Sequence, residues 1–389
     1  MVKKGYKQTE VGVIPEKWKD KKLGDVGKVC MCKRIFANQT SNTGEVPFFK
    51  IGTFGKEADA YISKGLYEDY KQRFSYPQKG DVLISAAGTL GRTIVFEGKD
   101  AYFQDSNIVW LDTDKELLCN EYLYHYYKVI KWGASEGSTI ARLYNGIICN
   151  THIALPDVEE QKQIATVLSE LDELMYVTEK QIEKKKAIKQ GAMQELLTGK
   201  RRLPGFSGEW ETKKLEDYCS LITKQTGFDY SAYIKPALIT RKMPNTFPMI
   251  QTINFRGRKF TFETDYYIPQ SVAMQFPNIV LNKKCVLFSI VGASVGNVGL
   301  YPGSITAFCG GAIGITRFRN EQDAEWVFNY MSSPDGQSQI QYVTKGGAQA
   351  TVTIADIRNF KIPTPEKDER DAISGILENM DHEIEVLEQ

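Results

Sequence analysis

The chain of 389 residues contains one pattern twice, and this duplication constrains its fold more than any other feature. Trp18 is followed after two residues by Lys-Lys-Leu, and Trp210 is followed by the same residues at the same spacing. Four more blocks recur in the same order: PFFKIGTF as PMIQTINF, DVLISAAGTLG as CVLFSIVGASVG, EYLYHYY as EWVFNYM, and ALP as KIP. The offset between the copies grows from 192 to 207 residues. A repeat this long indicates a duplicated domain, because solenoid repeats have periods of about 20 to 50 residues.

Each copy is predicted to hold a mixed domain followed by a long helix. The runs VLISAAG and VLFSIVG are short, apolar and bounded by glycine, which is typical of strands. Apolar positions in EYLYHYYKVI and EWVFNYMSS recur at helical spacing. We therefore expect an α+β fold with two duplicated mixed α/β domains, each followed by a long helix. The expected ranges are 1–155 and 200–362 for the mixed domains, and 156–199 and 363–389 for the helices.

The first long helix is predicted to begin after Pro156, with Asp157 as N-cap and Gly199 as its C-terminal stop. Its apolar residues recur at heptad spacing, interrupted at Lys185 and Lys189, and the second helix keeps the same spacing at an offset of 209. A helix with one apolar stripe needs a partner. We expect the two helices to pair as an antiparallel intramolecular coiled coil; the alternative is that each stripe packs on its own domain. The expected seam residues are Ile164, Leu168, Leu171, Met175, Ile182, Ile373, Leu377, Met380 and Ile384.

Charge is distributed unevenly along the chain, although the total is only +1. Residues 1–155 carry a net charge of +4 and residues 200–362 carry +7. The two helical segments carry −3 and −7. This asymmetry indicates that the mixed domains face an anionic partner such as nucleic acid, and that the helices face something else.

A search for catalytic and metal-binding patterns yields none that fits. PDVEEQK has the acidic residues of a metal-dependent nuclease, but at the start of a helix they would point in different directions. His125, His152 and His382 are scattered, and the glycine-rich loops lack the P-loop lysine and the full GxGxxG spacing. The seven cysteines have no CxxC spacing, so we expect buried thiols in a reducing, cytoplasmic environment. No apolar run reaches the roughly 20 residues that a membrane span requires.

Binding is the remaining function, and the basic domains hold residues suited to contacts with nucleic acid. Arginine and lysine suit guanine edges and phosphates, and asparagine and glutamine suit adenine. The alternative for each of these residues is an ordinary solvated loop, which is common for polar loops of this kind. The candidate DNA-binding residues are Lys33, Arg34, Asn38, Gln39, Thr53, Lys56, Arg92, Lys224, Gln225, Asn254, Arg256, Arg258 and Lys259.

The segment PDVEEQKQIATVLSELDELM, with LLTGKRRLPGFSGEW further on, resembles the specificity subunits of Type I restriction–modification systems. The resemblance covers essentially the whole chain. It implies two target-recognition domains, each reading one half of a bipartite double-stranded DNA target, and two antiparallel helices that set the gap between the half-sites. It also implies docking of modification subunits, which bind S-adenosylmethionine and methylate adenine, and of restriction subunits, which use ATP and Mg²⁺. By the same resemblance, the specificity subunit has no catalytic residue, metal or cofactor of its own.

Two features depart from the family pattern. Glu369–Arg370 stands where the first copy has Glu160–Gln161, and the second helical segment is about 18 residues shorter than the first at the offset of 209. Both features put the symmetry of the helix pair in doubt.

Two other classes of protein compete with a DNA-binding subunit. A stand-alone methyltransferase or nuclease would need a cofactor loop or metal carboxylates. A coiled-coil scaffold joining two protein-binding modules would bind no DNA.

Overall fold

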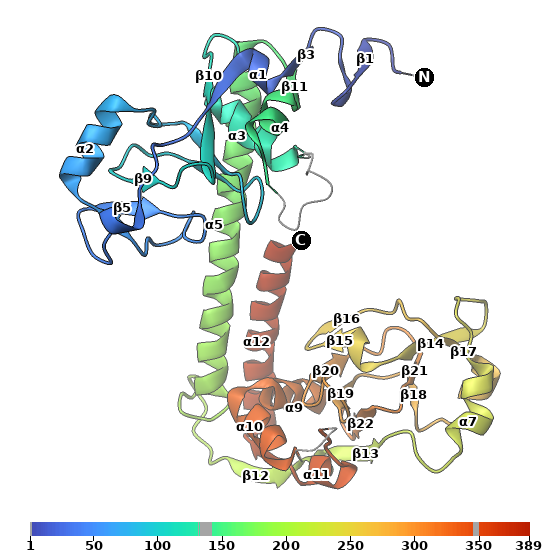
Figure 1. Cartoon of the computed structure of the whole chain (residues 1–389). Helices are drawn as coiled ribbons and strands as arrows, with labels where there is room; N and C mark the ends of the chain where they lie inside the picture. Colours follow the sequence, from blue (N-terminus) through green and yellow to red (C-terminus); the bar gives the residue numbers. More distant parts are fainter. Residues whose placement is uncertain (1, 131, 133–141, 345–349) are drawn as a thin grey trace. The chain divides into compact units, whose positions relative to one another are not determined.

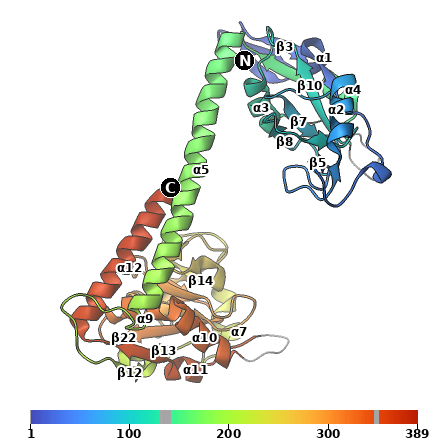
Figure 2. The ribbon, with the colours of Figure 1, turned by 90° about the vertical axis from the view of Figure 1, so that its left-hand side faces the viewer.

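The computed structural model describes residues 2–130, 132, 142–344 and 350–389. The chain forms two compact units, Met1–Val177 (unit 1) and Thr178–Gln389 (unit 2). The division falls inside the first long helix. Figures 1 and 2 show the elements of each unit in two views.

Unit 1 is built on a four-stranded antiparallel sheet with the order β4-β10-β7-β8. One face of this sheet packs against helix α3 (Asn120–Val129), because Val82 and Ile84 point to that side while Leu83 points to the other. The opposite face packs against a smaller sheet in which β5 pairs antiparallel with β6 and parallel with β9. The strand bounds are β4 Gly27–Cys30, β10 Ile108–Thr113, β7 Val82–Ser85, β8 Thr93–Val95, β5 Val46–Phe49, β6 Tyr61–Ile62 and β9 Tyr102–Phe103.

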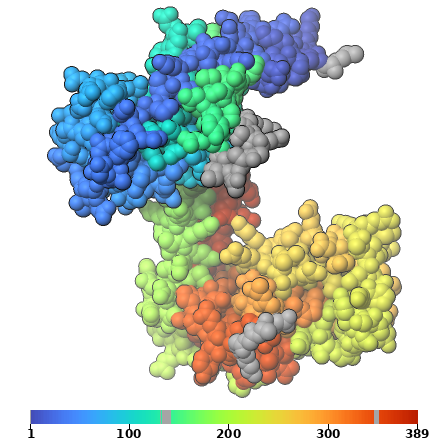
Figure 3. Space-filling model, viewed as in Figure 1, coloured from blue at the N-terminus to red at the C-terminus, as the bar shows by residue number. Residues whose placement is uncertain are grey.

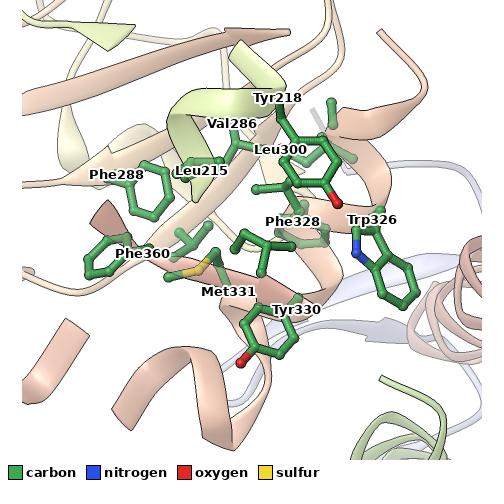
Figure 4. Packing of buried hydrophobic residues seen from close by; sticks show 14 of the residues in the cluster. Leu215, Tyr218, Val286, Phe288, Leu300, Trp326, Phe328, Tyr330, Met331 and Phe360 are labelled. Atoms are coloured by element: carbon green, nitrogen blue, oxygen red, sulfur yellow. The ribbon is translucent and has the colours of Figure 1, made fainter. Parts of the chain in front are cut away.

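Unit 2 repeats this arrangement. Its main sheet has the order β13-β22-β19-β20, and its second sheet has the order β17-β14-β21-β18. Helix α9 (Asp323–Ser332) covers the face formed by Val286 and Phe288, whose packing is shown in Figure 4. The strand bounds are β13 Cys219–Thr223, β22 Ile313–Phe318, β19 Cys285–Ser289, β20 Val298–Tyr301, β17 Tyr267–Pro269, β14 Thr246–Ile250, β21 Ala307–Cys309 and β18 Val280–Leu281.

The strand after each repeated tryptophan pairs with the strand that closes its own repeat. In unit 1, β3 (Lys19–Lys22) pairs with β11 (His152–Leu155), and in unit 2, β12 (Glu211–Lys214) pairs with β23 (Lys361–Thr364). The predicted duplication is therefore confirmed in strand order and pairing. The remaining elements of unit 1 are β1 Tyr6–Thr9, β2 Gly12–Pro15, α1 Leu23–Val26, η1 Ala37–Gln39, α2 Lys64–Arg73 and α4 Asn145–Asn150. Those of unit 2 are α6 Leu215–Tyr218, α7 Tyr230–Tyr233, η2 Lys235–Ala237, η3 Thr252–Asn254, β15 Phe255–Arg256, β16 Lys259–Phe260, α8 Gln270–Ala273, α10 Pro334–Val343 and α11 Ile354–Asn359.

The long helices begin and end where local chemistry allows. Helix α5 spans Val158–Leu196, and the carboxylate of Asp157 accepts the amide hydrogen of Glu160 at 2.9 Å, as an N-cap does. Gly199, just past the last turn, has φ +70°, a conformation that favours glycine. Helix α12 spans Lys367–Glu388.

Within unit 2, α12 runs antiparallel to the part of α5 that belongs to this unit (Figure 1). Lys185 pairs with Glu383 and Lys189 pairs with Asp381, so residue numbers rise along one helix as they fall along the other. Ile373 and Leu377 are fully buried in one cluster with Met193 and Leu196 of α5, with Leu197 just after it, and with the core beneath α9. Ile384 is buried, and Met380 and Ile182 are half-buried. The predicted antiparallel pairing is confirmed here, and so, in part, is the alternative that the stripe packs on its own domain.

The predicted seam residues in the first half of α5 have different surroundings. Ile164 packs against the core of unit 1. Leu168, Leu171 and Met175 are 37%, 50% and 61% exposed, so their place in a helix–helix seam stays a prediction. One physical reason for this difference is length, since α12 has 22 residues and α5 has 39.

Candidate nucleic-acid interface

In unit 1 the candidate residues gather on the loop after β4 and on the turn after β5. Lys33, Arg34 and Asn38 are exposed, and Arg34 donates from Nε to Asp105 at 2.8 Å. Gln39 is half-buried, and its side-chain oxygen accepts the amide hydrogen of Phe36 at 2.9 Å, which fixes the turn η1.

The second group in unit 1 combines one exposed cation with two residues that shape the loop. The hydroxyl of Thr53 accepts the amide hydrogen of Lys50, and Arg92 donates to the carbonyl of Phe54 at 2.9 Å. Lys56 is exposed on the same turn. The structure therefore brings Thr53, Lys56 and Arg92 together.

In unit 2 the candidates split between loop surface and structural roles. Lys224 and Gln225 are half-buried after β13, and Gln225 donates to the carbonyl of Cys309 at 2.8 Å. Asn254 is only 3% exposed; it accepts from the amide of Gln251 and donates to the carbonyl of Glu263. Asn254 thus holds the β14–β15 turn with its side chain.

The β15–β16 hairpin carries Arg256, Arg258 and Lys259, which the sequence places close together. Arg256 is exposed, and the part of the chain that the structure describes gives it no side-chain partner. Arg258 instead donates to Asp381 of α12 at 2.9 Å and to Glu325 of α9 at 2.7 Å. Its guanidinium also lies over the ring of Phe328. The side chain of Arg258 is therefore bound by partners within unit 2.

Charge on this hairpin is balanced by the carboxylates of α9 and α12. Burial alone would raise the pKa of Glu325, but hydrogen bonds from Arg258 and Lys284 hold that pKa below its ordinary value. Lys259 pairs with Glu388, which also pairs with Lys186 of α5 at 2.7 Å. The two lysines lower the pKa of Glu388 to about 2.

These pairs explain the interruption of the heptad pattern at Lys185 and Lys189. The two lysines meet carboxylates of α12, and Asp381 joins Lys189 to Arg258. The hairpin is thereby anchored to the helix pair of unit 2. Sequence reasoning missed this role of Arg258, although the acidic residues of the second helix were a signal for it.

The departure from the family pattern at Glu369–Arg370 also has a structural explanation. In unit 1, Gln161 is completely buried and accepts from the amide of Cys119 at 3.0 Å. In unit 2, Arg370 takes its place and pairs with Asp323 at 3.0 Å. Asp323 stands at the repeat position of Cys119, at the offset of 204 that aligns α3 with α9. The replacement of Gln161 by Arg370 in the second copy is therefore accompanied by the replacement of Cys119 by Asp323.

The cysteines are free thiols, as the sequence predicts. Of the seven, five are buried and two are half-buried. Burial raises the pKa of Cys32 and of Cys219 to about 12, which keeps these thiols protonated. Across the described ranges, no cluster of His, Cys, Asp and Glu side chains could hold a metal ion. No helix among the described residues has the length and apolar character that crossing a bilayer demands.

Comparison with known proteins gives consistent matches. Residues 15–189 and 207–389 each match the family described as the Type I restriction modification DNA specificity domain. A Haemophilus influenzae protein assigned as a type I restriction enzyme specificity subunit is 57% identical over 152 residues, which span 39% of this chain and 40% of that relative. A Methanocaldococcus jannaschii protein, assigned as the MjaX specificity subunit, is 27% identical over 98% of this chain and 91% of its own length. The crystal structure of a Type I S subunit from M. genitalium has a TM-score of 0.60 at 13% identity, covering 95% of this chain and 91% of that one, which shows the fold.

Proposed function

Because the chain belongs to the Type I restriction–modification DNA specificity family, with two specificity domains, we propose that each unit reads one half of a bipartite DNA target. The chain is the subunit that directs target recognition and is not a catalytic subunit of the system. The observation that carries the proposal is the repetition of one architecture in two units with different exposed loop residues. Two such readers joined by one chain suit two unlike half-sites.

Chemistry on the DNA belongs to other subunits. We propose that modification subunits bind S-adenosylmethionine and methylate adenine, and that restriction subunits use ATP and Mg²⁺. The place of action that we propose is the cytoplasm, which agrees with seven free cysteines.

We propose that the exposed apolar residues of α5 dock the modification subunits. Leu171, Leu174 and Met175 are 50%, 61% and 61% exposed on one stretch of this helix. Contiguous exposed apolar residues commonly mark protein–protein contacts. Glutamate at Leu174 and Met175 should abolish association with the modification subunit, measured by size-exclusion chromatography, while the thermal unfolding midpoint stays unchanged. Retained association would contradict this docking surface.

The DNA interface that we propose consists of the exposed or half-buried polar residues of the two loop regions. Arg258 and Asn254 are left out, because their side chains hold the fold of unit 2. Lys259 is also left out, since it pairs with Glu388. The proposed residues are Lys33, Arg34, Asn38, Gln39, Thr53, Lys56, Arg92, Lys224, Gln225 and Arg256.

Methylome sequencing of a host that carries the chain with its own modification and restriction subunits tests the proposed function. We expect methylated adenines in a motif of two short specific parts separated by unspecified bases. A single continuous motif would contradict two-unit reading. An electrophoretic shift with and without the modification subunits separates this function from a scaffold that binds only proteins.

A further inference from the structure

Each unit contains an open cavity next to the loop that follows the first strand of its main sheet. The cavity of unit 1, here called cleft 1, has a volume of about 390 Å³ and is lined by residues that include Arg34, Lys50 and Asn107. The cavity of unit 2, here called cleft 2, has a volume of about 490 Å³ and is lined by residues that include Gln225 and Gln251. In the space-filling view, the segment 225–252, which supplies part of the lining of cleft 2, is yellow-green to yellow and lies on one side of unit 2 (Figure 3).

The two clefts occupy the same position in the repeated fold. In unit 1 the parallel pair β5–β9 ends with a hydrogen bond from the amide of Gln104 to the carbonyl of Phe49, at 2.9 Å. In unit 2 the parallel pair β14–β21 ends with the same bond, from the amide of Gly310 to the carbonyl of Ile250, at 2.8 Å. Gln104 lines cleft 1 and Gly310 lines cleft 2, so equivalent backbone positions form one wall of each cleft.

The outer edge of each cleft is also equivalent. After β4 the chain reaches Phe36 and then the single turn η1, and after β13 it reaches the short helix α7, which starts at Tyr230. Both aromatic residues line their clefts, and Phe36 and Tyr230 are 58% and 37% exposed. An exposed ring beside a polar cavity is suited to stacking or apolar contact with a base.

The lining chemistry differs between the clefts although their positions agree. The described residues that line cleft 1 include the cations Arg34, Lys50 and Arg142 and the carboxylate of Asp105. Among the described residues that line cleft 2, none is charged, and the polar groups include the side chains of Gln225 and Gln251. A cavity that both copies keep while its lining changes is what two readers of different sequences require.

Two amide side chains are available for recognition. Asn107 in cleft 1 and Gln251 in cleft 2 are both half-buried, and within the described residues neither side chain makes a hydrogen bond. An amide can form a bidentate pair with the N6 and N7 atoms of adenine, whereas arginine suits the O6 and N7 atoms of guanine.

We infer that clefts 1 and 2 are the base-reading sites of the two units, with Asn107 and Gln251 as specificity-determining residues. Cleft 2 reads adenine through Gln251. Cleft 1 reads a purine edge through Asn107, and its cations extend recognition to a neighbouring guanine or phosphate. This inference rests on the proposed function and assigns it to particular side chains.

The test uses the full chain expressed with its modification subunits in a host without other adenine methyltransferases. Gln251→Ala and Asn107→Ala are compared with wild type and with Asn359→Ala, an exposed residue outside both clefts. Methylome sequencing should show that Gln251→Ala relaxes one position of one half-site, with roughly 10- to 100-fold less discrimination. Asn107→Ala should relax the other half-site, and Asn359→Ala should leave the motif unchanged. Gln251→Asn keeps the amide but shortens it, and serves if the alanine variant does not fold.

Three results would overturn the inference. The clefts do not read bases if both cleft variants keep the wild-type motif and its discrimination. The assignment of one cleft to each half-site fails if both variants relax the same half-site. It also fails if relaxation follows Asn359→Ala equally. A wild-type complex without any sequence-specific methylation would instead contradict the proposed function, which is a distinguishable outcome.

Discussion

The indole nitrogen of Trp210 donates a hydrogen bond to the carboxylate of Glu369 at 3.0 Å. The same bond joins Trp18 to Glu160 in unit 1, at 3.1 Å. Each bond ties the start of a mixed domain to the first turn of the helix that follows it, and so repeats the duplication at the level of single atoms.

The two glutamates should differ in their contribution to stability. Glu369 is only 1% exposed and also accepts two hydrogen bonds from Arg202, at 2.7 and 2.8 Å. We expect Glu369→Gln to lower the free energy of unfolding of unit 2 by roughly 3 kcal/mol, because the substitution removes the negative charge and replaces one acceptor oxygen with an NH2 donor that faces the donors of Arg202 and Trp210. Urea unfolding resolved by hydrogen exchange of unit-2 peptides measures this change. The matched variant Glu160→Gln should cost about 1 kcal/mol in unit 1, and equal losses would contradict the prediction.

The pair Arg370–Asp323 should be energetically coupled. Arg370→Gln removes the partner of Asp323 and should destabilise unit 2, since Asp323 is largely buried at 15% exposure. A double-mutant cycle with Asp323→Ala should give a coupling energy of about 1 to 3 kcal/mol. Additive losses would show that the two side chains are not energetically coupled and would contradict the prediction.

Arg256 and Arg258 are two residues apart but should give opposite results. Arg256→Ala should weaken DNA binding by the complete complex and reduce the slope of log affinity against log salt by about one, with no change in unfolding free energy. Arg258→Ala leaves Glu325 and Asp381 without their shared cation and should cost roughly 3 kcal/mol in unit 2. Fluorescence anisotropy at several salt concentrations measures DNA binding by the two variants, and urea unfolding measures their stability. A stable Arg258→Ala variant with weak DNA binding would reverse this assignment.

The sequence predicted features whose causes are local. The cap at Asp157, the stop at Gly199 and the strand at Val82–Ser85 follow from neighbouring residues, and the duplication follows from alignment of the chain with itself. The acidic second helix was a signal for a partner of Arg258, but the particular residue could not be predicted, because Asp381 lies 123 residues further along the chain and its position depends on the register of α12. The clefts escaped prediction for a related reason, since segments that are distant in sequence form the walls of each.

Unit 1 should lose stability in mild acid through His125. This side chain on α3 contacts Ser169 of α5 at 2.9 Å, with Lys128 and Asp172 nearby. Burial lowers the pKa of His125 and the charge of Lys128 lowers it further, while Asp172 opposes both. The folded-state pKa therefore lies below the unfolded value of about 6.5, and the unfolded chain binds the proton more readily.

The sign of the pH effect follows from this order of pKa values. The stability that neutral His125 contributes is fully present above about pH 6.5 and is lost as the pH falls through the folded-state pKa, with a slope of at most about 1.4 kcal/mol per pH unit. Asp172 does not titrate in the pH range where His125 does, because Lys128 lowers the pKa of that carboxylate below its ordinary acidic value. His125→Gln should flatten the difference in unfolding free energy between pH 7.5 and pH 5.5, measured on unit-1 peptides by hydrogen exchange in urea. An unchanged pH dependence in the variant would show that another group titrates, because glutamine keeps a polar contact to Ser169 but binds no proton.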